Sequence, residues 1–96
     1  MKKYLAIGHF NDSKNMVSVA MKATSNKNFR ENLSGNCFIP YVVISEKKME
    51  ILKNTNSFDL FDEIKKMTSN YRIWNDICDY IEQCFDIMEE KMQNAN

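Results

Sequence analysis

The single histidine and the three cysteines are the first residues to examine for catalysis. A nucleophilic mechanism requires a serine or cysteine, a base and a group that orients the base. His9 is the only histidine, and Cys37 is the cysteine that a sheet could bring near it. No local signature accompanies the pair, and a histidine at a strand end is more commonly solvated or hydrogen-bonded to backbone. We therefore predict no catalytic residues and interpret the protein as a non-enzyme.

Metal and cofactor sites have equally little support. Cys78 and Cys84 lie six residues apart on a predicted helix, so they point in directions about 120° apart. One histidine cannot complete a tetrahedral set with them, and two isolated glycines cannot form a phosphate-binding loop. We interpret both cysteines as small core residues. The sequence predicts no metal and no cofactor.

Charge is distributed unevenly along the chain. Residues 1–72 contain twelve Lys and Arg and seven Asp and Glu, whereas residues 73–96 contain one lysine and six acids. The two parts therefore carry net charges of +5 and −5, which sum to zero. A chain of zero net charge is not the strongly basic domain that is typical of nucleic-acid binding.

The acids of the last predicted helix occupy one side of it. Six carboxylates fall within an arc of roughly 140° at 100° per residue, and a tyrosine and an isoleucine lie at the edge of that arc. These eight residues are Asp76, Asp79, Tyr80, Glu82, Asp86, Ile87, Glu89 and Glu90. Only Arg72, four residues before Asp76, is spaced within the helix to offset any of the charges.

Two interpretations of this acidic arc remain open. It is either a solvated face opposite the core or a surface that steers a basic partner, such as the groove of a nucleic-acid-binding protein. In the second interpretation, exposed Tyr80 and Ile87 supply apolar anchors beside the charges. We expect a protein-interaction domain, a stoichiometric inhibitor or adaptor, that binds a basic protein through this helix.

A nucleic-acid interpretation and a homodimer are the alternatives. RNA or single-stranded DNA would use basic and aromatic residues of the N-terminal sheet. These residues are Lys3, Tyr4, His9, Phe10, Lys22 and Tyr41. No motif of an RNA-binding fold appears, so this is the second choice. A homodimer would place the acidic helix of one copy on the basic part of another.

The elements that must position these residues follow from the pattern of apolar side chains. Alternation predicts strands over 3–10, 16–23 and 37–45, the first two forming a hairpin. Helical spacing predicts helices over 26–33, 46–54, 58–67 and 71–93. The order β-β-α-β-α-α-α predicts a single α+β domain over residues 1–96. Its small, mainly antiparallel three-stranded sheet packs on a long C-terminal amphipathic helix.

Local signals predict where these elements begin and end. Pro40 places the third strand at an edge or beside a bulge, and Gly35 lies where a helix end favours positive φ. Phe58 is predicted to face inward together with Phe61 and Ile64. Four hydroxyl residues are placed to cap the helices that follow them. These are Thr24 or Ser25, then Ser45, then Ser57.

Composition predicts a cytoplasmic setting. Three cysteines are an odd number, which disfavours a secreted disulfide framework, and no signal peptide is recognisable. The chain contains twelve asparagines and eleven lysines, a bias typical of AT-rich genomes. In composition alone it resembles the small proteins of phages and conjugative elements in such bacteria. That resemblance implies an inhibitor or adaptor rather than a catalyst.

Overall fold

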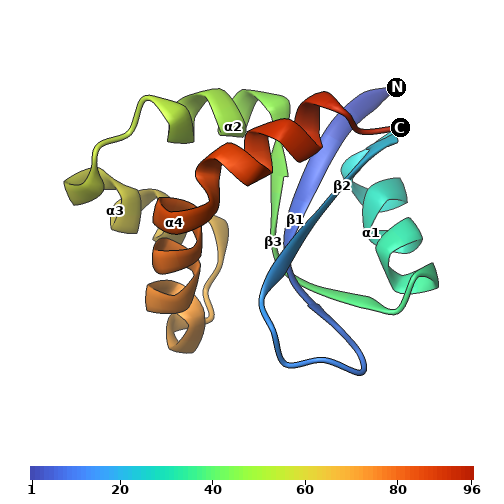
Figure 1. The fold of residues 1–96 in the computed structure, drawn as a ribbon, viewed down its shortest axis with the longest axis horizontal. Helices are drawn as coiled ribbons and strands as arrows, with labels where there is room; N and C mark the ends of the chain where they lie inside the picture. The colour runs from blue at the N-terminus through green and yellow to red at the C-terminus, as the bar shows by residue number, and fades with distance from the viewer.

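The computed structural model describes residues 1–96 as a three-stranded antiparallel sheet with helices on both faces (Figure 1). The strands are β1 (Lys2–Phe10), β2 (Val17–Ala23) and β3 (Phe38–Ser45), in the spatial order β2-β1-β3. The helices are α1 (Asn26–Gly35), α2 (Glu46–Lys53), α3 (Ser57–Met67), the 3-10 turn η1 (Tyr71–Ile73) and α4 (Trp74–Gln93). The predicted α+β fold, with its hairpin and long C-terminal helix, is confirmed.

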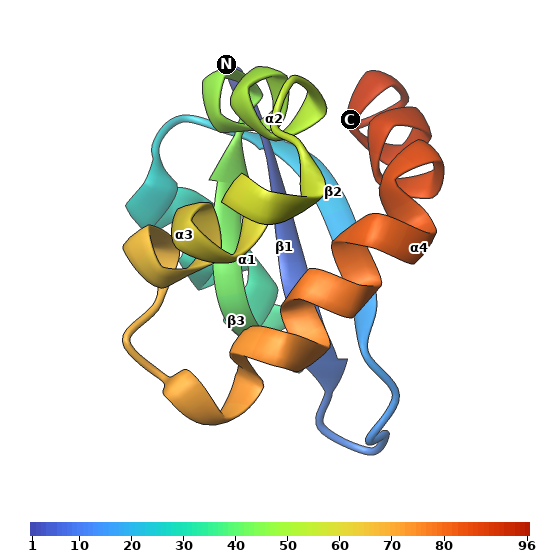
Figure 2. The same cartoon turned by 90° about the vertical axis from the view of Figure 1, so that its left-hand side faces the viewer.

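The two faces of the central strand belong to two separate cores. Leu5 and Ile7 pack with residues of α2, α3 and α4, whereas Tyr4 and Ala6 pack with α1. Side chains alternate between the faces of a strand, so β1 is buried on both sides. Figure 2 shows the same division, with α2, α3 and α4 in front of the sheet and α1 behind it. Helices therefore pack against both faces of the sheet.

The edge strand β3 contains the predicted irregularity. Ile7 pairs with Val42 while Gly8 pairs with Pro40, so Tyr41 is an extra residue on β3. Pro40 has no amide hydrogen to donate, which explains why pairing is interrupted beside it on an edge strand. β3 also approaches β1 closely at this point, because a Cβ added to Gly8 would overlap the carbonyl oxygen of Ile39.

Two of the predicted helix caps are confirmed. The side chains of Ser25 and Ser45 accept hydrogen bonds from the backbone amides of Asn28 and Lys48, at 3.1 and 3.2 Å. These bonds satisfy amides that the first turn of a helix leaves without partners.

The predicted start of α3 is wrong, and its predicted inward face is confirmed at Ile64 but wrong at Phe58. Asn56 rather than Ser57 caps the helix, accepting a hydrogen bond from the amide of Asp59 at 2.9 Å. The buried face consists of Leu60 and Ile64, and Phe58 is 94% exposed. Spacings of three and four fit both sets of apolar residues, so periodicity alone could not separate them. The elements opposite α3 decide which set is buried.

The predicted positive φ at Gly35 is also wrong. Gly35 is the last residue of α1, and the left-handed residue is Cys37, with φ 59°. The helix closes through Asn36, whose amide donates to the carbonyls of Asn32 and Leu33. The chain therefore turns toward β3 two residues later than the glycine indicated.

The last helix is not straight. Cys84 has φ −121° and ψ 18°, and Figure 1 shows α4 changing direction midway. No proline or glycine lies nearby to mark the break in the sequence. The break divides the predicted acidic arc, with three acids before it and three after it. None of the helices combines the length and the apolar content that a membrane span would need.

Candidate protein-binding surface

Five of the six predicted acids lie free on the surface of α4. They are exposed and form no ion pair within the chain, whose salt bridges involve only Glu63 and Glu89 among the acids. The five are Asp76, Asp79, Glu82, Asp86 and Glu90. The predicted pairing of Arg72 with Asp76 is absent, because no salt bridge joins these two residues. We refer to these five residues as the acidic face.

The sixth acid, Glu89, is held by a neighbouring helix. Its carboxylate lies 3.2 Å from the ammonium of Lys53 on α2. The hydrogen bond and charge of Glu89 raise the pKa of Lys53 above its ordinary value. The ion pair connects the second half of α4 to α2. Because Glu89 is half-buried, it is less accessible to a partner than the acidic face.

Tyr80 is not the exposed anchor that the sequence predicts. Its ring is half-buried, and its hydroxyl donates a hydrogen bond to Ser18 Oγ on β2 at 2.9 Å. Ser18 is 3% exposed, so the bond satisfies a buried polar group. Tyr80 therefore attaches the first half of α4 to the sheet.

The first half of α4 also borders a shallow cavity of about 340 Å³. Asp76 and Asp79 line it, and Lys14 of the β1–β2 loop lies across from them. Met16 and Tyr80 are its apolar lining residues. The cavity combines one apolar wall with two free carboxylates.

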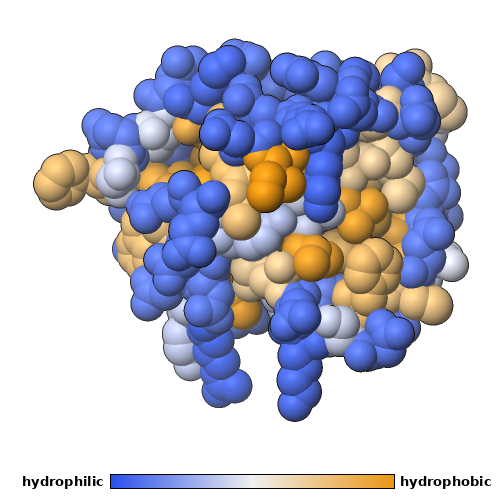
Figure 3. Space-filling model, viewed as in Figure 1, coloured by the Kyte–Doolittle hydropathy of each residue, from blue (hydrophilic) through white to orange (hydrophobic).

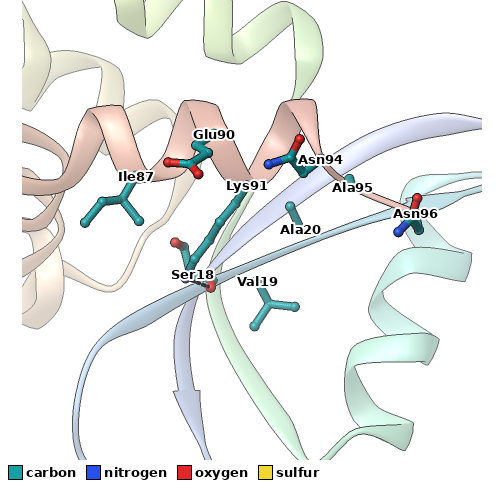
Figure 4. A pocket seen from close by; sticks show the side chains of 9 residues that line it. All are labelled: Ser18, Val19, Ala20, Ile87, Glu90, Lys91, Asn94, Ala95 and Asn96. Carbon is teal, nitrogen blue, oxygen red and sulfur yellow. Dashed lines mark hydrogen bonds between the residues drawn. The ribbon is translucent and has the colours of Figure 1, made fainter.

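Ile87 is the exposed apolar residue of α4, with 50% of its surface accessible. It lines a groove of about 610 Å³ between the second half of α4 and β2. Figure 4 shows Ile87 and Glu90 on the helix side, Ser18 and Ala20 on the strand side, and Lys91 reaching across. The ammonium of Lys91 donates to the Ser18 carbonyl at 2.7 Å. No residue pattern in the sequence indicates this groove, because its two walls lie about seventy residues apart.

The residues of the nucleic-acid alternative are not brought together. Tyr4 is 7% exposed and stacks on Phe29 under α1, with ring centroids 5.4 Å apart. Tyr41 packs against His9 instead, at 5.5 Å, and contacts the core on the other face of the sheet. A surface of stacking aromatics needs them on one face, and Tyr4 and Tyr41 lie on opposite faces of the sheet.

His9 is held by backbone groups at the end of β1 and in the loop that follows. His9 Nδ1 lies 2.8 and 2.9 Å from the carbonyl oxygens of Phe10 and Ser13, so the ring bonds to backbone, as predicted. Burial, together with the nearby charge of Glu82, raises the pKa of the Cys78 thiol. No three histidine, cysteine or acidic side chains converge to hold a metal ion.

Both helix cysteines are half-buried. Cys78 packs against the core, as predicted for a small apolar residue. Cys84 is the residue at which α4 changes direction.

Comparisons with known proteins add no family. No protein-family model matches the chain, no curated protein resembles it significantly in sequence, and no solved structure resembles it significantly in fold.

Proposed function

We propose that the protein is a non-enzymatic interaction domain, an inhibitor or adaptor, that binds a basic partner protein through α4. One observation carries the proposal. The five carboxylates of the acidic face are exposed and lack cationic partners within a chain that contains thirteen Lys and Arg. The only cation on α4, Lys91, is directed to a backbone carbonyl instead.

Repulsion within the acidic face supports a role beyond solubility. Before the break at Cys84, Asp76, Asp79 and Glu82 follow one another at spacings of three, and after it Asp86 and Glu90 lie four apart. Each such pair destabilises a helix by roughly 0.2–0.5 kcal/mol. A basic partner removes this repulsion on binding, and long-range attraction raises its association rate.

Ile87 gives the charged face an apolar contact. Interface residues that contribute most of the binding energy are commonly apolar side chains surrounded by polar ones. Ile87 has this setting, because Asp86 and Glu90 lie beside it and the groove opens next to it. The partner is therefore expected to present an apolar residue among lysines or arginines.

Affinity capture with charge-reversed protein tests the proposal. The test variant carries Asp79→Lys, Glu82→Lys and Asp86→Lys, three free acids from both halves of α4. The matched control carries Asp12→Lys, Glu31→Lys and Asp62→Lys, which are exposed acids outside α4. Both variants have the same net charge, and circular dichroism establishes that each is folded.

The expected result is a basic protein recovered with the wild type and the control but not with the test variant. Its association rate with the wild type should fall as salt is added, because exposed charges are screened. Equal recovery with both variants would refute the role of the acidic face. Recovery of nuclease-sensitive RNA or DNA would favour the nucleic-acid alternative.

A further inference from the structure

We infer that the outer edge of β2 takes up an extended segment of the partner as a fourth strand, with lysine or arginine alternating with apolar residues along that segment. This inference rests on the proposed function and specifies the form in which the basic partner is bound. It follows from the backbone geometry of β2, from the contacts that its edge already makes, and from the side chains on its two faces.

The backbone of β2 presents its even-numbered residues to the outside. β2 is an edge strand, with β1 on one side only. The amide of Lys22 donates to Asn96 and the carbonyl of Ser18 accepts from Lys91, both away from β1. Main-chain groups alternate in direction along a strand. The amide and carbonyl groups of Ser18, Ala20 and Lys22 therefore all point outward.

Most of these outward groups have no partner in the chain. Of the six, only the Lys22 amide and the Ser18 carbonyl are bonded. Both groups of Ala20 remain free, beside the groove that Ala20 lines. The carbonyl oxygen of Asn96 lies 3.1 Å from the amide nitrogen of Lys22. A paired strand would make the same kind of contact with this edge. An extended polypeptide is the ligand that matches a row of free amides and carbonyls.

The side chains beside the edge define the two faces of the added strand. On the α1 side, the partly buried Val17, Val19 and Met21 extend the smaller core toward solvent. On the α4 side, Glu90 borders the groove next to Ile87. Figure 3 shows hydrophobic surface in the middle of this side of the molecule, with hydrophilic side chains above and below it. Apolar residues fit the first face, and a basic residue fits the second face where it meets Glu90.

Lys91 protects the edge in the free protein. Its ammonium donates a hydrogen bond to the Ser18 carbonyl, and Ser18 is only 3% exposed. A strand that pairs as far as Ser18 must displace it. Lysines beside open edges commonly prevent unwanted pairing between chains.

A capped nine-residue peptide of alternating lysine and valine, labelled with a fluorophore, is the probe. Two peptides of the same charge serve as controls, one N-methylated at every lysine amide and the other at every valine amide. In an antiparallel pairing the lysine amides face β2, and in a parallel pairing the valine amides do. Fluorescence anisotropy at low salt measures the affinity of each peptide for the wild-type protein.

The expected result is that one methylated peptide binds at least roughly tenfold more weakly than the unmodified peptide, since it loses several hydrogen bonds. The other methylated peptide should bind nearly as well as the unmodified one. Ala20→Pro, which removes an outward amide but no hydrogen bond to β1, should also weaken binding, and circular dichroism establishes that this variant is folded. Lys91→Met should strengthen it, and only for the peptides that can pair.

Equal binding of the two methylated peptides, at any affinity, would overturn the inference, as would failure of all three to bind. The Asp79, Glu82 and Asp86 reversal is tested with the same peptide to separate the two proposals. If that reversal abolishes peptide binding while methylation has no effect, binding by the acidic face is supported and strand addition at β2 is refuted. If methylation weakens peptide binding and the charge reversal does not, strand addition is supported and the role of the acidic face is refuted.

Discussion

Replacing Gly8 by alanine should destabilise the protein strongly, and the reason lies in the bulge between β1 and β3. A Cβ at residue 8 would overlap the carbonyl oxygen of Ile39 and lie 2.9 Å from the Cα of Pro40. Both neighbours are backbone atoms, so no flexible side chain can move aside. β3 would have to shift away from the central strand to make room.

The magnitude follows from two opposing effects. Overpacking of this kind costs roughly 3 kcal/mol when backbone must move. Replacing a strand glycine by alanine ordinarily stabilises a protein by about 0.5–1 kcal/mol, because it reduces the conformational entropy of the unfolded chain. The net loss is therefore about 2 kcal/mol or more, out of a total stability of about 5–14 kcal/mol for a domain of this length. The melting temperature should fall by at least about 8 °C.

Gly35→Ala is the matched control and should have the opposite sign. Nothing lies within 4 Å of the Cβ that this substitution adds, and Gly35 ends α1 with negative φ. The variant should gain up to about 1 kcal/mol of stability. Urea unfolding followed by circular dichroism measures both variants. If Gly8→Ala is as stable as the wild type, or if Gly35→Ala is clearly less stable than the wild type, the argument from the close approach of β3 to Gly8 is refuted.

Three further outcomes are expected from urea unfolding. Tyr80→Phe should lose about 0.5–1.5 kcal/mol, because the buried Ser18 hydroxyl loses its partner; unchanged stability would contradict this. Phe58→Ser should change stability by less than about 0.5 kcal/mol, since the ring is almost fully exposed, and a larger loss would restore its predicted core role. Hydrogen bonds from Lys48 and Lys66 lower the pKa of Glu63, so its stabilisation is complete above its ordinary pKa of about 4.3 and is lost as pH falls through the lowered value. Glu63→Gln should therefore be less stable than the wild type at neutral pH but not in strong acid. A difference in unfolding free energy that stays the same at every pH would argue against the ion pairs of Glu63 with Lys48 and Lys66.

The sequence alone predicts the features that depend on residues near one another in the chain. Alternation in residues 3–10 is enough to place Leu5 and Tyr4 on opposite faces of β1. A serine before a helical run is enough to predict its cap, as Ser25 and Ser45 show. Pro40 predicts an edge strand or a bulge because a missing amide hydrogen is a property of that residue alone. The concentration of acids on α4 is also visible in the sequence.

Tertiary structure decides which of those acids and apolar residues a partner can reach. Glu89 is paired with a lysine thirty-six positions earlier, and Tyr80 with a serine sixty-two positions earlier. Phe58 and Leu60 are equally apolar, yet only Leu60 meets the core. The break at Cys84 has no local signal and changes the direction of the second half of α4. Periodicity describes a helix by itself, whereas exposure, pairing and bending depend on the element packed against it, and that element is distant in the sequence.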